Sequence, residues 1–184
     1  LELTVEGQKE AGISSVILHE ETLRNTYKGF NLVKKWLIDR GINVILKTDK
    51  GLKPIDPANP KGEQISNPKG FDELPAMLDK AIEANAIATK WRTTQLITNE
   101  LPTETNERNM RDNGRDQGRQ ARMTQDRITQ DRILVPMVEP EVLINGSHNI
   151  ATSYAYTTRT LEITVEELEK AGVWLDGMIL KTSM

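Results

Sequence analysis

Short apolar runs alternate with longer amphipathic segments along this chain. Five of the runs are rich in branched or other apolar residues and end abruptly in polar or charged ones, at residues 13–18, 42–46, 86–92, 133–138 and 177–181. Such runs are typical of buried parallel strands whose C-terminal ends reach solvent. The pattern therefore predicts five parallel strands.

Three segments between these runs carry apolar residues at helical spacing, at residues 30–40, 71–85 and 157–171. Gly41 and Gly172 follow the first and the last of them, in the position that a C-terminal cap favours. Alternating strands and helices with short turns require parallel strands joined by right-handed crossovers. We therefore expect an α/β fold in a single domain that spans the whole chain.

Two connecting segments depart from the regular alternation. Residues 51–70 are rich in proline and glycine and predict a surface loop over the strand ends. Residues 104–132 occupy the place of a covering helix but have few apolar positions, which are Met110, Ala121, Met123 and Ile128. Their seven arginines invite a nucleic-acid interpretation, yet six acidic residues at helical spacing offset them. We expect an atypical polar helix or an insertion here, solvated or partly disordered.

Composition argues against several classes of function. The formal net charge is -3, which gives no electrostatic reason to expect a nucleic acid or an anionic membrane as a partner. Absence of cysteine removes disulfides and thiolate chemistry, and it fits a cytoplasmic location. No apolar run approaches the roughly 20 residues of a membrane helix, and no secretory signal is expected. Because His19 and His148 lack partners at ligand spacing, we expect neither a metal nor another cofactor.

Ionisable residues lie at the C-terminal ends of four predicted strands. They are Lys47 with Asp49, Lys90 with Arg92, Glu139 with Glu141, and Lys181. Residues two apart on a strand share a face, so each pair is directed to one side. If the strands are neighbours, all of these groups meet at one rim, which is where α/β enzymes keep their chemistry.

The predicted rim contains the groups that imine chemistry needs. A lone lysine at a strand end is more often a solvated surface residue. A desolvated lysine near a second cation loses its proton more readily, and Lys181 beside Lys90 would meet that condition. Glu139, with a raised pKa, could carry protons to and from a carbinolamine. Arg92 and Lys47 could bind an anionic substrate group. Schiff-base chemistry on a phosphorylated carbonyl compound follows as a hypothesis.

Five motifs resemble, in order, the strand ends of the class I fructose-bisphosphate aldolases. They are SVILHEETL at residues 15–23, ILKTDKGL at 45–52, KWR at 90–92, LVPMVEPEVL at 134–143 with GSH at 146–148, and GMILKTSM at 177–184. The resemblance covers nearly the whole chain but only the second to sixth βα units of the family's barrel. It therefore implies a partial (β/α)8 TIM barrel of about five βα units.

The resemblance also implies roles for individual residues. Lys181 would form the Schiff base, Glu139 would do the acid/base work, Lys90 would assist proton transfer and Glu141 would orient the lysines. Lys47 and Arg92 would hold the distal phosphate of the sugar. The chain has no counterpart of the family's first-strand aspartate or of its phosphate-binding serine and arginine near the last strands.

Two functions of different classes follow from these observations. The first is a cytoplasmic, glycolytic lyase that reversibly cleaves fructose 1,6-bisphosphate to triose phosphates through a Schiff base. It would act as a homo-oligomer or be completed by the missing barrel strands. The second is a catalytically inactive barrel fragment that serves as a structural or assembly piece, in which the strand-end charges keep an open sheet soluble.

Overall fold

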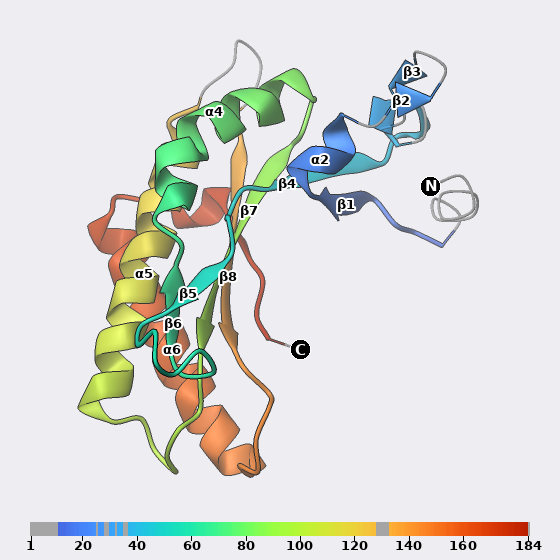
Figure 1. The fold of residues 1–184 in the computed structure, drawn as a ribbon. Coiled ribbons are helices and arrows are strands. Elements are labelled where there is room, and N and C mark those ends of the chain that lie inside the picture. The colour runs from blue at the N-terminus through green and yellow to red at the C-terminus, as the bar shows by residue number, and fades with distance from the viewer. Residues whose placement is uncertain are drawn as a thin grey trace.

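Five parallel strands form the central sheet of the protein (Figure 1). The structure is a computed structural model that describes residues 11–24, 26–27, 30–31, 33–34, 37–127 and 133–183. The strands are β1 (Ser15–Leu18), β4 (Asn43–Lys47), β7 (Ala88–Gln95), β8 (Val135–Val142) and β9 (Ile179–Leu180), in the spatial order β1-β4-β7-β8-β9. All four pairings are parallel, which confirms the predicted strands and their direction.

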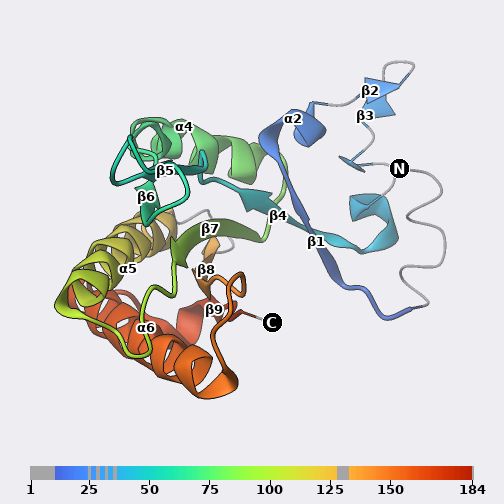
Figure 2. The ribbon, with the colours of Figure 1, turned by 60° about the horizontal axis from the view of Figure 1, so that its bottom comes forward.

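Three long helices cover one face of this curved sheet (Figure 2). They are α4 (Lys69–Glu83), α5 (Glu104–Gln125) and α6 (Ile150–Lys170). The smaller elements are α2 (Glu20–Leu23), the β2 (Thr26–Tyr27) and β3 (Phe30–Asn31) hairpin, the β5 (Leu52–Pro54) and β6 (Gln64–Ser66) hairpin, and the 3-10 turns η1 (Ile38–Arg40) and η2 (Leu175–Gly177). No described helix is long and apolar enough to span a bilayer.

The largest apolar core lies between α4 and strands β4 and β7. Leu74 and Leu78 of α4 are fully buried in one cluster with Leu46 and Trp91. The indole of Trp91 packs on the ring of Phe71 at 4.6 Å between centroids, and its Nε1 donates a hydrogen bond to Ser66. The apolar stripe read from residues 71–85 is therefore the buried face of this helix.

Helix α5 is continuous from Glu104 to Gln125 and packs against the sheet with a polar face. It is polar, as expected for this segment, but the expectation that it is solvated is wrong for this face, which is buried. Thr103 caps it through a capping box with Asn106. Buried amides replace the missing apolar stripe: Asn113 donates to the Thr94 carbonyl at 2.9 Å, and Gln117 donates to the Trp91 carbonyl at 3.2 Å. Residues 128–132 lie outside the described residues.

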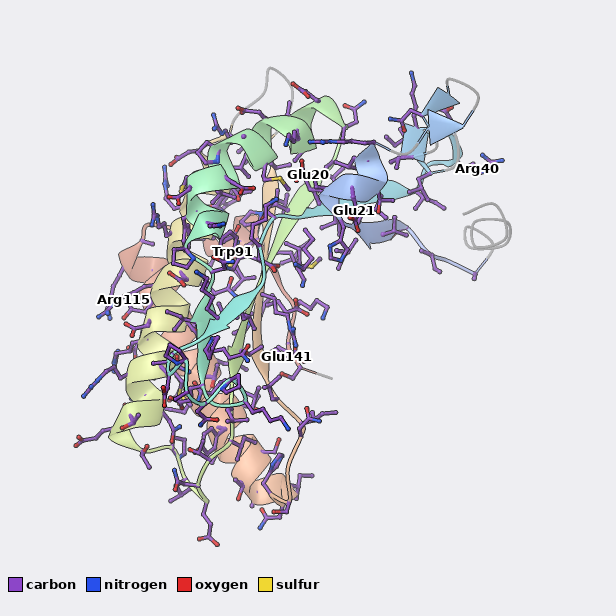
Figure 3. The ribbon with its side chains drawn as sticks, viewed as in Figure 1. Glu20, Glu21, Arg40, Trp91, Arg115 and Glu141 are labelled. Carbon is purple, nitrogen blue, oxygen red and sulfur yellow. The ribbon has the colours of Figure 1, made fainter. Side chains whose placement is uncertain are left out.

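Several arginines of α5 lie on its exposed side and form ion pairs there. Arg115 points away from the sheet (Figure 3) and pairs with Asp112 at 3.0 Å. Arg111 reaches Glu166 on α6 at 3.2 Å, and Arg122 pairs with Asp126. Ion pairs thus account for these three arginines; those of Arg115 and Arg122 follow the helical spacing of the acidic residues, whereas that of Arg111 joins α5 to α6.

Three predicted elements differ from the observed ones. The helix expected over 30–40 begins instead with strand β3, residues 32, 35 and 36 are outside the described residues, and the segment ends in η1 with Gly41 at φ 74°. The helix expected over 157–171 starts seven residues earlier, where the Asn149 side chain accepts a hydrogen bond from the Thr152 amide. The loop expected over 51–70 contains the β5–β6 hairpin.

The opposite face of the sheet carries no helix among the described residues. Its inner part is apolar, with Ile45, Ala88 and Met137 in one small cluster. Strands β1 and β9 are the two edges, and they do not pair with each other. The sheet is therefore open, and its uncovered face carries the side chains of alternate strand residues.

Candidate active site

Period-2 geometry sends the six predicted site residues to the uncovered face of the sheet. On β7, Trp91 points into the core beneath the helices, so Lys90 and Arg92 point the other way. The pairing register sets Lys47 beside Lys90 and Arg92 beside Glu139. The remaining members follow from the same alternation; they are Glu141 on β8 and Lys181 directly after β9.

The carboxylate of Glu139 joins the two lysines. Lys181 Nζ donates a hydrogen bond to Glu139 Oε1, and Lys90 Nζ forms an ion pair with Glu139 Oε2. The side chains of Lys90 and Glu139 are only 8% and 6% exposed, whereas that of Lys181 is 36% exposed. An accessible amine thus shares a buried carboxylate with a buried amine.

The charge state of Glu139 differs from the expected one. Burial raises the pKa of this carboxyl, but hydrogen bonds and charge attraction from Lys181 and Lys90 outweigh burial and lower the pKa below its usual range. The raised pKa expected from the sequence is therefore wrong for this state, because two ammonium groups favour the carboxylate. Glu139 is poised here to accept a proton.

Glu141 pairs with Arg92 and, among the described residues, forms no ion pair with Lys90 or Lys181. Arg92 Nε donates to Glu141 Oε2, and this hydrogen bond is the main reason that the pKa of Arg92 is raised. Because the two side chains are 36% and 30% exposed, water reaches the pair. In this state Glu141 thus orients the guanidinium, in contrast to the lysine-orienting role that the resemblance implies.

Lys47 is held by Asp49, a residue to which the sequence assigned no role. Lys47 Nζ donates to Asp49 Oδ1 at 2.5 Å and to the Asp49 carbonyl at 3.1 Å. The buried Asp49 also accepts the Arg92 backbone N–H at 3.3 Å. Its position two residues after Lys47, at the same strand end, was the feature of the sequence that could have indicated this contact. Asp49 thereby fixes the separation of the two predicted phosphate ligands.

Within the described part of the chain, no three histidine or acidic side chains come together as a metal site. The site instead combines the accessible amine of Lys181, the Glu139 carboxylate that joins it to Lys90, and the cations of Lys47 and Arg92. All of them lie on the uncovered face of the sheet. These groups can form an imine with a carbonyl compound, move protons and attract an anion. Groups from three strand ends therefore meet, because Glu139 is in direct contact with both Lys181 and Lys90.

Comparisons with known proteins agree on one family. The family model described as fructose-bisphosphate aldolase class-I matches residues 1–184. A probable fructose-bisphosphate aldolase class 1 of Xanthomonas campestris is 36% identical over 172 residues, which are 94% of this chain and 48% of that protein. Fructose-bisphosphate aldolase 5, cytosolic, of Arabidopsis thaliana is 36% identical over 173 residues, which are 94% of this chain and 45% of that protein.

A solved structure gives the same result for the fold. Fructose-bisphosphate aldolase from Plasmodium falciparum, solved in a complex with TRAP and a small-molecule inhibitor, superposes with a TM-score of 0.75 at 30% identity. The match covers 92% of this chain and 46% of that one. It confirms the prediction of an α/β fold that forms part of a barrel. The chain spans about half the length of the relatives it matches.

Proposed function

Because the chain belongs to the class I fructose-bisphosphate aldolase family, we propose that its rim performs the Schiff-base step of aldol cleavage on a phosphorylated ketose. The observation that supports this most directly is the contact of Glu139 with both Lys181 and Lys90. The substrate proposed is fructose 1,6-bisphosphate, and the products are two triose phosphates.

Lys181 is the proposed nucleophile because it is the more accessible of the two amines on Glu139. Its ammonium first passes a proton to the Glu139 carboxylate, with which it shares a hydrogen bond. The free amine then adds to the ketone carbon, and the carbonyl oxygen takes up the proton that the attacking nitrogen loses, which gives a neutral carbinolamine. Glu139 returns a proton to the departing hydroxyl, so water leaves and the protonated imine forms.

Lys90 is the proposed electrostatic partner of that sequence. Its ammonium stays next to Glu139 while Lys181 changes from ammonium to amine and then to iminium. A fixed positive charge 8% exposed to solvent acts strongly on its neighbours, because little water screens it. Together with Lys181 it lowers the pKa of Glu139, and the resulting carboxylate is the form that can accept a proton from Lys181.

Lys47 and Arg92 are the proposed ligands of the distal phosphate. Lys47 has three N–H donors, of which Asp49 takes two, and one remains for an anion. Arg92 keeps donors beyond the Nε that Glu141 uses.

We also propose a cytoplasmic location, which the cytosolic plant relatives support.

Completion of the barrel is part of the same proposal. Ile17 on one edge strand and Leu180 on the other are 39% and 42% exposed, so both edges carry open apolar surface. Further barrel strands or a second copy of the chain would cover them. These exposed edges also support the alternative function, a catalytically inactive barrel fragment that serves as a structural or assembly piece.

Borohydride reduction with dihydroxyacetone phosphate separates the two functions. If the proposal holds, reduction leaves a stable adduct that peptide mass analysis places on Lys181. Lys181→Arg should abolish the adduct, whereas Lys53→Arg, on the exposed β5–β6 hairpin, should not. A wild-type chain that folds normally by circular dichroism and yields no adduct at Lys181 refutes the proposed function and supports the structural alternative.

A further inference from the structure

The strand that delivers Lys181 is short and lies at the edge of the sheet. β9 comprises only Ile179 and Leu180, which pair with Met137 and Val138 of β8. One further backbone bond follows, from the Lys181 N–H to the Val138 carbonyl at 2.9 Å. The residue carrying the proposed nucleophile is therefore the last one held by regular backbone pairing.

The sequence of β8 explains why the pairing stops there. Alternate residues of a strand direct their backbone groups to the same neighbour, so Val138, Pro140 and Val142 all face β9. In the observed register the next bond would run from the N–H of residue 140 to the Lys181 carbonyl. Proline has no N–H, so that bond cannot form.

Ser183 restores the connection with its side chain. The Val142 N–H donates to Ser183 Oγ at 2.8 Å, and the Ser183 hydroxyl donates to the Val142 carbonyl at 3.3 Å. A hydroxyl can both accept and donate, so one side chain satisfies both backbone groups. Lys181 thus lies between two attachments to β8, one at Val138 and one at Val142.

We propose that Ser183 is a positioning residue for Lys181, acting as a side-chain clamp that replaces the strand pairing interrupted by Pro140. This inference rests on the proposed function, in which Lys181 forms the imine. Ser183 touches no reacting atom. It holds the backbone on the far side of Lys181, so that the amine stays against Glu139 although its side chain is partly exposed.

A displacement of the amine by about 1 Å is enough to slow an aligned reaction by up to ~100-fold. Ser183→Ala removes the second attachment and leaves the first. We expect the rate of borohydride-trappable imine formation to fall about tenfold with little change in KM, because the phosphate ligands lie on β4 and β7. Ser183→Thr keeps the hydroxyl and should restore the rate.

Two further variants separate positioning from general stability. Thr182→Ala changes the neighbouring exposed residue, which has no hydrogen-bond partner among the described residues, and should leave the rate unchanged. Pro140→Ala supplies the missing N–H opposite the Lys181 carbonyl. Combined with Ser183→Ala, it should recover part of the lost rate. No recovery by Ser183→Thr, or an equal loss in Thr182→Ala, overturns the inference.

Amide hydrogen exchange tests the clamp without reference to catalysis. The Lys181 amide should exchange faster in Ser183→Ala than in the wild type, since its bond to Val138 loses the support beyond it. Equal exchange in the two proteins contradicts the clamp even if the chain is active. A wild type with no imine at all refutes the proposed function instead, and the exchange result then decides the clamp alone.

Discussion

Substitution of Glu139 by glutamine should cost far more stability than the same substitution at Glu141. The two residues are two apart on β8, on the same face, and each is paired with basic groups. Among the described residues, Glu139 is the one carboxylate that joins Lys90 and Lys181, and Glu139→Gln removes it. Glu141→Gln removes a single contact to Arg92 that water already reaches.

The magnitude follows from burial. The pair of Lys90 and Glu139 is more than nine-tenths buried, and loss of one partner from such a pair costs about 3–5 kcal/mol because the other charge stays buried without compensation. A Coulomb estimate of ~4 kcal/mol at about 4 Å and an effective dielectric constant near 20 agrees. Lys181 adds little, because its exposed ammonium can turn to water. For Glu141→Gln we expect about 0.5–1 kcal/mol.

The difference between wild type and Glu139→Gln should depend on pH. Since the folded-state pKa of Glu139 is lowered, the folded protein holds this proton less tightly than the unfolded chain does. The carboxylate therefore contributes stability above the unfolded pKa of 4.5, and that contribution is lost as the pH falls through the lower folded value. The wild type should approach the variant in acid.

Urea unfolding followed by circular dichroism at neutral pH and near pH 3 measures both effects. The free energy of unfolding should differ by several kcal/mol at neutral pH and by clearly less in acid. A loss below about 1 kcal/mol at neutral pH, equal to that of Glu141→Gln, would show that the two lysines do not depend on this carboxylate.

Two further predictions concern regions away from the rim. Hydrogen bonds from Lys80 and Lys50 lower the pKa of Glu20 to about 2, so the stability that Glu20 contributes above pH 4.5 should be lost as the pH falls toward 2. Glu20→Gln should cost about 1–2 kcal/mol at pH 7 and flatten this dependence, as acid titration of the unfolding midpoint would show; an unchanged slope argues against it. Gly118→Ala should destabilise by about 1 kcal/mol in urea unfolding, because a Cβ would lie 2.9 Å from a backbone carbonyl of α6. Gly114→Ala meets mainly a flexible side chain, at 3.2 Å, and should be tolerated; equal effects of the two would refute close α5–α6 packing as the cause.

The five strands and their parallel direction could be predicted, because buried strands appear in the sequence as short apolar runs. A parallel strand that is mostly buried on both faces reads as a nearly continuous apolar run, as residues 42–46 do apart from Asn43. Strand ends were less visible. β7 continues to Gln95 through polar residues, because Thr93 and Gln95 are buried beneath α5, where Gln117 and Asn109 donate hydrogen bonds to their side chains.

Helix α5 shows where pattern reading stops. The periodicity of apolar residues detects helices that bury hydrocarbon, whereas α5 buries amides that bond to backbone carbonyls of β7. Asparagine and glutamine look the same in the sequence whether they face water or a strand. Only the position of the partner strand distinguishes the two, and that is a tertiary fact.

The composition of the candidate site was predictable from strand parity, but its pairing was not. Parity places Glu139 and Glu141 on one face and cannot say which of them meets a lysine. Register does not settle it either: it sets Glu139 level with Arg92 and, one residue beyond β9, with Lys181, yet Arg92 pairs with Glu141 two residues further along. The directions that the side chains take decide the pairing. The same register explains the proposed role of Ser183, since Pro140 offers no N–H to the Lys181 carbonyl and the next attachment to β8 is the Ser183 hydroxyl at Val142. A proline in the strand that holds the proposed general base thus determines how the strand that holds the proposed nucleophile is attached.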